Sequence, residues 1–196
     1  RITEASVRNG WQVCTHAIGD RGNRLVLDAY ESALKKVPAA DRSVSDPRLR
    51  IEHAQVVALS DIPRFAQLGV IASMQPTHCT TDMRWVVDRV GDRWVGAYAW
   101  RRFLAGEVRL AFGSDFPVEK VSPLLGLYSA ITRQDLDGDP GGGFMPDQRL
   151  TLDEALRAFT AGSAYASFDE QRLGVLRPGM QCDLTVFDHE LSQNSA

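Results

Sequence analysis

Short apolar segments alternate with amphipathic segments along this chain, and the alternation limits the possible folds more than any other feature. Four apolar segments are predicted to be buried strands: residues 11–17, 49–54, 70–76 and 109–113. Between them, apolar residues recur at helical spacing, for example over 23–36 and 60–68. Strands and helices in this order, joined by short polar loops, predict an α/β fold with parallel strands and right-handed crossovers.

The rest of the chain carries further predicted elements. Helices are expected over 84–90, 95–104 and 123–133, a Gly-rich loop over 137–143, and an apolar strand over 183–187. Thr151 and Glu154 have the spacing of a capping box, so a helix is expected to begin there and run to about Tyr165.

Polar side chains stand at or just after the end of each of the four predicted strands. They are His16, His53, Gln75 with His78, and Asp115. In an α/β barrel the carboxyl ends of the parallel strands meet on one face, and that face holds the active site. The sequence therefore predicts that His16, His53 and Asp115 converge, although 37 and 62 residues separate them along the chain.

Each of these residues has a functional and a structural interpretation. Neutral imidazole is the commonest metal ligand, yet His16 or His53 alone is more typical of a half-buried histidine bonded to backbone. Their shared position at strand ends favours ligands. Asp115 is either a turn residue or helix cap, or a metal-bound carboxylate that takes a proton from metal-bound water. His78 is either an exposed loop residue or a substrate contact, and Asp20 is either a helix cap or part of the site.

Composition excludes several classes of partner. A net charge of −3 and a pI near 5.8 attract neither nucleic acid nor an anionic membrane. No apolar run approaches the ~20 residues that cross a bilayer, and no glycine-rich nucleotide-binding motif occurs. The three cysteines are widely spaced without a CxxC pair, which indicates reduced thiols and a cytoplasmic protein.

Several motifs occur in a fixed order along the chain: THAIGDRGN, IEHAQ, SMQPTH, FGSDFPV and the closing LGVLRPGMQCDLTVFD. Together they resemble the amidohydrolase superfamily, and more narrowly its amidohydrolase-3 branch of YtcJ-like metal-dependent hydrolases, over about residues 5–188. The resemblance implies a (β/α)8 TIM-type barrel with one or two divalent metals, zinc being expected, at its C-terminal mouth.

The resemblance also implies roles for single residues. His16 is carried over as the metal ligand of the fifth strand, His53 as that of the sixth, and Asp115 as the ligand of the eighth strand and the general base. His78 and Gln75, in the segment after the seventh strand, are carried over as substrate-binding residues.

Residues 1–165 then correspond to the second half of the barrel, and residues 166–196 to a C-terminal tail whose strand returns to a small β-sandwich. The first-strand His-x-His pair and the fourth-strand lysine or carboxylate of the family have no counterpart here. Because the chain starts within what resembles the fourth helix, we expect a fragment with an incomplete metal site. Its expected partner is the missing N-terminal half or a second copy of the chain.

The function predicted on this basis is the hydrolysis of carbon–nitrogen bonds other than peptide bonds in small molecules of amide, N-acyl or formamide type. The isolated fragment is expected to be inactive. Two alternatives remain open from the sequence. One is an incomplete half-barrel that serves as an assembly or binding module, and the other is a barrel hydrolase that cleaves lactones or phosphotriesters.

Overall fold

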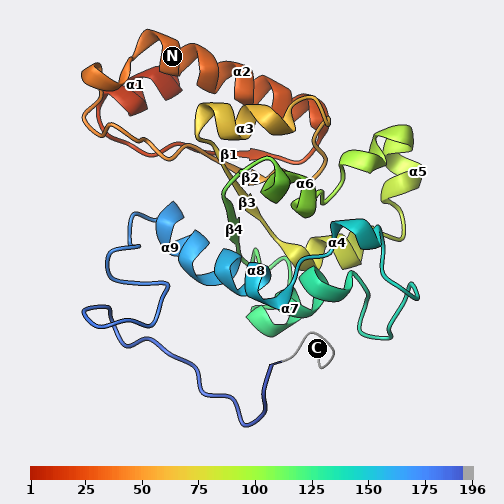
Figure 1. The fold of residues 1–196 in the computed structure, drawn as a ribbon. Helices are drawn as coiled ribbons and strands as arrows, with labels where there is room; N and C mark the ends of the chain where they lie inside the picture. The colour runs from red at the N-terminus through yellow and green to blue at the C-terminus, as the bar shows by residue number, and fades with distance from the viewer. Residues whose placement is uncertain (192–196) are drawn as a thin grey trace. The chain divides into compact units, whose positions relative to one another are not determined.

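The computed structural model describes residues 1–191 and divides into two compact units (Figure 1). Unit 1 consists of residues 1–73 and 93–109, and unit 2 consists of residues 74–92 together with the chain from 110 onward. No helix within residues 1–191 combines the length and the apolar character needed to span a lipid bilayer.

Unit 1 is built on parallel strands joined by helical crossovers. Its elements are α1 (Ile2–Arg8), β1 (Cys14–Ala17), α2 (Asp20–Lys36), η1 (Ala39–Asp41), β2 (Arg50–His53), α3 (Ile62–Leu68), β3 (Ile71–Met74, whose last residue lies in unit 2) and α6 (Trp100–Ala105). Thr15 is the register partner of Ile51, and Ile51 that of Ala72, with both strand pairs parallel. The predicted α/β class with parallel strands is confirmed.

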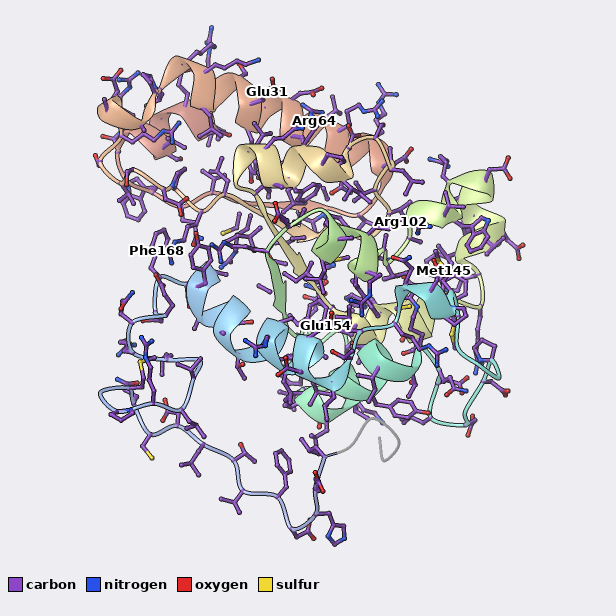
Figure 2. All side chains as sticks on the ribbon, in the orientation of Figure 1. Glu31, Arg64, Arg102, Met145, Glu154 and Phe168 are labelled. Atoms are coloured by element: carbon purple, nitrogen blue, oxygen red, sulfur yellow. The ribbon has the colours of Figure 1, made fainter. Side chains whose placement is uncertain are left out.

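Helices cover one face of β1 and β2. Tyr30 of α2 reaches the strands, where its hydroxyl lies 2.7 Å from Thr15 Oγ1 and donates to the Arg50 carbonyl at 2.7 Å. Helices α2 and α3 are joined by the Arg64 guanidinium, which lies 2.9 Å from Glu31 Oε2 (Figure 2). The opposite face carries alternate residues of both strands and is polar, with Arg50 Nε 2.9 Å from Glu52 Oε1.

Unit 2 is mainly helical. Its elements are α4 (Pro76–Asp82), α5 (Val86–Val90), β4 (Leu110–Phe112), α7 (Pro123–Thr132), η3 (Pro146–Gln148), α8 (Leu152–Arg157), the π-helical segment η4 (Ala158–Gly162) and α9 (Ser163–Ala166). Helix α4 packs against α7, and η4 and α9 pack against β4. The Ala72 N–H donates to the Arg109 carbonyl, and the Gly113 N–H donates to the Met74 carbonyl. The residue numbers of the partners rise together along residues 72–74 and 109–113, as they do between parallel strands.

The predicted capping box is confirmed at the start of α8. Thr151 Oγ1 accepts from the Glu154 N–H at 3.2 Å, and Glu154 Oε2 accepts from the Thr151 N–H at 2.8 Å. The helical path continues through η4 and α9 to Ala166, close to the predicted end. Gly162 is required on this path, because a Cβ there would lie 2.2 Å from the Leu110 carbonyl oxygen.

Three predictions about elements were wrong. Pro76 begins a helix, α4, rather than ending a strand, because proline is favoured in the first turn of a helix, where its missing N–H is not needed. The helix expected over 95–104 begins only at Trp100, after the 3-10 segment η2 (Gly91–Gly96). Residues 183–187 form no strand, and Val186 is 84% exposed. A strand needs a neighbour to bond with, and none lies beside this segment among residues 1–191.

Candidate active site

In unit 1 the two predicted histidine ligands lie together. His16 and Ala17 end β1, and Ala17 is the register partner of His53 at the end of β2. The imidazole rings of His16 and His53 meet edge to face, with centroids 4.5 Å apart and planes at 73°. Because the two strands are parallel neighbours, residues 37 positions apart in sequence converge at their carboxyl ends.

The backbone at His53 makes this contact possible. In a regular pleat His53 would share the face of Ala17, its register partner, and not that of His16. Instead β2 ends in two non-glycine residues with positive φ, +75° at His53 and +44° at Ala54. Such conformations cost on the order of 1 kcal/mol each and collect at functional sites. The turn redirects the His53 ring toward His16, which makes the pair a candidate for function.

A buried asparagine secures the loops behind the histidine pair. Asn23 Nδ2 donates to the carbonyl oxygens of Ala17 at 3.2 Å, Gly19 at 2.9 Å and Val56 at 3.2 Å. These bonds tie the loop after β1 to the segment after β2. The Asp20 carboxylate accepts from Arg93 Nη1 at 2.7 Å and makes no side-chain cap, so the helix-cap interpretation of Asp20 is wrong.

In unit 2 the carboxylate and the third histidine lie together. Asp115 follows β4 with φ +60°, and its Oδ2 lies 3.2 Å from His78 Nε2. His78 belongs to α4 and is 9% exposed, so its interpretation as an exposed loop residue is wrong. Gln75 is the buried N-cap of the same helix, and its side chain does not cap it.

Glu119 belongs to this cluster, and the sequence did not point to it. Its Oε1 lies 3.3 Å from His78 Nδ1 and accepts from Thr81 Oγ1 at 2.8 Å. The His78 ring thus lies between two carboxylates, that of Glu119 at Nδ1 and that of Asp115 at Nε2, and these contacts orient it. Glu119 sits in an irregular loop after the FGSDFPV motif, where neither periodicity nor a strand end distinguishes it. Only a carboxylate four residues past Asp115 could have served as a signal.

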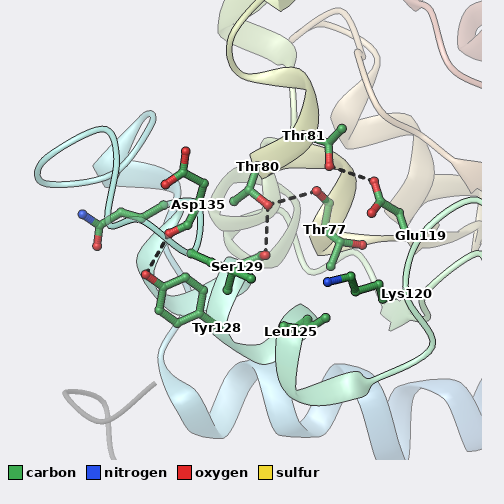
Figure 3. Close-up of a pocket in the computed structure, with 11 residues that line it drawn as sticks. Thr77, Thr80, Thr81, Glu119, Lys120, Leu125, Tyr128, Ser129 and Asp135 are labelled. Carbon is green, nitrogen blue, oxygen red and sulfur yellow. Dashed lines mark hydrogen bonds between the residues drawn. The ribbon is translucent and has the colours of Figure 1, made fainter.

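A cavity of about 200 Å³ adjoins the cluster in unit 2 (Figure 3). It is lined by Thr77, Thr80, Thr81, Glu119, Lys120, Leu125, Tyr128, Ser129, Gln134, Asp135 and Leu136. Its wall is held by hydrogen bonds, because Thr80 Oγ1 donates to the Thr77 carbonyl at 3.0 Å and lies 3.1 Å from Ser129 Oγ. Thr81 and Glu119 line the cavity and also connect it to His78 and Asp115.

Two of the three cysteines, Cys14 and Cys79, are unsuited to thiolate chemistry. Burial raises the pKa of Cys79 to about 11, and burial also raises the pKa of Cys14 above its ordinary value. Both are thiols at neutral pH, whereas a metal ligand or a nucleophile must be a thiolate. The donors that remain at the strand ends are imidazole nitrogens and a carboxylate, which are the ligand types of catalytic zinc sites.

The fold and these side chains define a class of protein: an α/β protein with candidate imidazole and carboxylate metal ligands beyond the carboxyl ends of parallel strands. The model of the amidohydrolase family matches residues 1–195, and this chain belongs to that family. The predicted membership is thereby confirmed.

Three curated relatives are similar to the chain. Protein LONG AFTER FAR-RED 3 of Arabidopsis thaliana is 38% identical over 99% of the chain, and YtcJ of Bacillus subtilis (strain 168), whose name describes an amidohydrolase, is 34% identical over 95%. N-substituted formamide deformylase of Arthrobacter pascens is 29% identical over 92%. The chain spans only 32%, 34% and 32% of these relatives, about a third of their length.

Solved structures agree with this assignment. An uncharacterized metal-dependent hydrolase from Pyrococcus horikoshii OT3 has a TM-score of 0.73 at 30% identity, over 88% of this chain and 33% of that one. A second, from Pyrococcus furiosus, has a TM-score of 0.69 at 33% identity, over 88% and 32%. The zinc-complexed atrazine chlorohydrolase TrzN of Arthrobacter aurescens TC1 shares the fold, with a TM-score of 0.56 at 22% identity, over 92% and 37%.

Proposed function

We propose that this chain is the C-terminal part of a metal-dependent hydrolase that cleaves carbon–nitrogen bonds other than peptide bonds. The observation that carries the proposal is the edge-to-face pair of His16 and His53 at the ends of neighbouring parallel strands. Family membership supports it, as does the name of the Arthrobacter pascens relative, which describes removal of a formyl group from a substituted nitrogen. Amides, N-acyl compounds and formamides are the proposed substrates.

The proposed metal ligands are His16 and His53 of unit 1 and Asp115 of unit 2. The donor set fits zinc, because imidazole nitrogen and carboxylate oxygen are its usual ligands in hydrolases. A bound divalent metal supplies Lewis acidity toward water and toward the substrate carbonyl. The gathering of these three residues at one site stays a prediction that rests on the order of the motifs.

The proposed chemistry of the chain's own residues centres on Asp115. With Oδ2 held by His78, Asp115 keeps Oδ1 to take a proton from the attacking water and to pass it to the leaving nitrogen. Glu119 lies at the other side of the His78 ring and is itself held by Thr81, so these two residues position the base. Gln75 and His78 stay the proposed substrate-side residues.

The remaining parts of the site are proposed to come from outside this chain. Because the chain spans about a third of its curated relatives, a first-strand His-x-His pair and a fourth-strand ligand would be supplied by an N-terminal half or by a partner subunit. The division into a half-barrel, residues 1–165, and a tail toward a β-sandwich, residues 166–196, also stays a prediction. We expect chain 1–196 alone to be inactive.

The test uses the longer protein that carries this chain, loaded with zinc and offered N-substituted formamides, N-acyl amides, lactones and phosphotriesters. Turnover of the first two groups alone supports the proposal. Preference for lactones or phosphotriesters favours the other type of barrel hydrolase. Zinc binding without turnover of any group favours a binding or assembly module.

A further inference from the structure

The backbone just after His53 pairs with a second segment of unit 1, residues 96–98. The Tyr98 N–H donates to the Gln55 carbonyl at 2.8 Å. One residue further along, an isolated antiparallel bridge connects the same two segments. The residues that follow β2 are therefore held by backbone pairing even though they lie outside the parallel sheet.

A buried side-chain hydrogen bond joins these two segments as well. Gln55 Nε2 donates to Tyr98 Oη at 2.6 Å, and the two residues are only 7% and 2% exposed. Tyr98 has φ +49°, so it shares the positive φ of His53 and Ala54, at +75° and +44°. Non-glycine residues stay in such sparsely populated conformations only where the surrounding structure holds them there. The pairing of the two segments provides that hold.

Gly96 sets how closely the two segments approach. A Cβ at this position would lie 2.0 Å from the Val57 carbonyl oxygen, so any other residue would push the segments apart. With glycine there, the Val57 N–H donates to the Gly96 carbonyl at 3.0 Å. The close approach keeps the Tyr98 hydroxyl within reach of the Gln55 amide.

The turn is fixed from its other side by the loop after β1. Asn23 Nδ2 donates to the Val56 carbonyl at 3.2 Å, and the Val56 N–H donates to the Ile18 carbonyl at 2.8 Å. These bonds set where the segment lies beside β1. The carbonyl and the side chain of Gln55 are both bonded to Tyr98, which sets the orientation of the segment. A segment fixed in position and orientation cannot return to the negative φ that ordinary L-residues prefer.

We propose that Tyr98 is a positioning residue for the histidine pair. Through Gln55 it keeps the His53 ring turned toward His16 before any metal is bound. Without this hold the turn would relax to negative φ, and a regular pleat would place His53 on the face of Ala17. The inference rests on the proposed function, in which both histidines are metal ligands, and deepens it by naming the residue that orients one of them.

The orientation of the ring is tested in the metal-free longer protein, deuterated and ¹³C-labelled only in its histidine rings. The signals of His16 and His53 are assigned by their disappearance in His16→Asn and His53→Asn. Ring centroids 4.5 Å apart should give a ring-to-ring NOE in the wild-type protein. Tyr98→Phe should weaken or abolish this NOE, because it removes the acceptor of the Gln55 amide and leaves the backbone bond between the two residues in place.

Gln55→Met removes the donor of the same hydrogen bond and should act like Tyr98→Phe, so it replaces that variant if the latter does not fold. An NOE of equal strength in Tyr98→Phe and Gln55→Met, or none in the wild-type protein, would overturn the inference.

Two further variants distinguish positioning from a purely structural role. Tyr30→Phe is the matched control, because it removes another buried tyrosine hydroxyl that is bonded to β2, at the Arg50 carbonyl. It should lower the melting temperature and leave the NOE in place. Adding Ala54→Gly to Tyr98→Phe should restore much of the NOE, because glycine adopts positive φ without steric cost. Loss of the NOE in Tyr30→Phe, or no recovery with Ala54→Gly, would overturn the positioning role.

Zinc affinity of the longer protein provides the second arm. Tyr98→Phe should weaken zinc binding ~10–100-fold, the usual cost of losing a residue that orients a metal ligand. It should also alter the visible absorption spectrum of the cobalt(II)-substituted protein. Tyr30→Phe should change neither. Wild-type zinc affinity in Tyr98→Phe would overturn the inference even if the NOE were lost.

The two arms separate the positioning role from the proposed function. An NOE that depends on Tyr98, in a longer protein that binds no zinc, keeps the hold on the His53 ring and removes the metal-dependent hydrolase. Zinc binding and turnover that Tyr98→Phe leaves unchanged, with the NOE intact, keep the hydrolase and remove the positioning role.

Discussion

The two units gather their polar side chains by different physical means. In unit 1 the strand register brings His16 and His53 together, since both end neighbouring parallel strands. In unit 2 Asp115 and His78 meet through side-chain hydrogen bonds between helix α4 and the loop after β4, with Glu119 of that loop as the third member. A site built from strand ends can be predicted from hydrophobic patterning, whereas a site built from loops depends on packing. Substitutions in each group test whether the histidine pair of unit 1 and the Asp115 cluster of unit 2 also differ in what they contribute to metal binding and to turnover.

The largest effect is expected at Asp115. In the longer protein Asp115→Asn should lower kcat by about 10²–10⁴, because the amide cannot take the water proton. The melting temperature should change little, since Asp115 is exposed. Steady-state kinetics and thermal unfolding measure both, with Asp188→Asn in the exposed tail as control. Activity close to normal in Asp115→Asn would leave Asp115 as a turn-forming residue only.

The next effect concerns metal binding by unit 1. Replacing a residue that only hydrogen-bonds a metal ligand lowers metal affinity ~10–100-fold. Removing a ligand itself should cost more, so His16→Asn and His53→Asn should each weaken zinc binding by more than about a hundredfold. Competition with a chromogenic chelator measures the affinity. His189→Asn, 89% exposed in the tail, is the matched control and should change nothing. Unaltered zinc affinity in both strand-end variants is the result that speaks against the ligand assignment.

Glu119 tests whether the loop-built cluster positions the base. Glu119→Ala should reduce kcat about 10–100-fold with little change in KM, because His78 loses the partner that orients its ring. Glu119→Gln, which keeps an oxygen acceptor for Nδ1–H, should restore much of the loss. The pH profile of kcat should shift in the alanine variant and not in Glu190→Ala, an exposed control. Equal loss in the alanine and glutamine variants, with an unchanged pH profile, would point to a purely structural role.

The smallest effect concerns the helix-covered side of unit 1. Burial is the main cause that raises the pKa of Tyr30 to about 12 from an ordinary value of 10, so folding favours the protonated phenol. Its contribution to stability is complete below pH 10 and is lost as pH rises toward 12. Tyr30→Phe should cost about 1 kcal/mol at pH 7, where it removes the hydrogen bond to the Arg50 carbonyl.

Urea unfolding at pH 7 and between pH 10 and 11.5 measures this effect of Tyr30. The difference in unfolding free energy between the wild-type chain and Tyr30→Phe should shrink as pH rises through this window. A difference that stays constant would show that the phenol ionises equally well in the folded and unfolded chains.

Several features of the fold and site were predictable because they follow from local patterns. Apolar runs broken by amphipathic stretches specify parallel strands and crossover helices, and Thr151 with Glu154 specifies the start of α8. The proximity of His16 and His53 follows from the same pattern, since the carboxyl ends of neighbouring parallel strands lie side by side. The ordered motifs around these residues also sufficed to indicate the family.

Other features were decided only by the tertiary structure. The His53 ring turns toward His16 because His53 and Ala54 both have positive φ. The sequence does not predict these angles, since neither residue is glycine. Whether Glu119 reaches His78, and whether Lys120 and Thr77 line one cavity, depends on how α4 and the loop after β4 pack. Hydrophobic periodicity is a property of regular backbone, so it carries no information about side chains that meet across irregular loops, and only their packing determines those contacts.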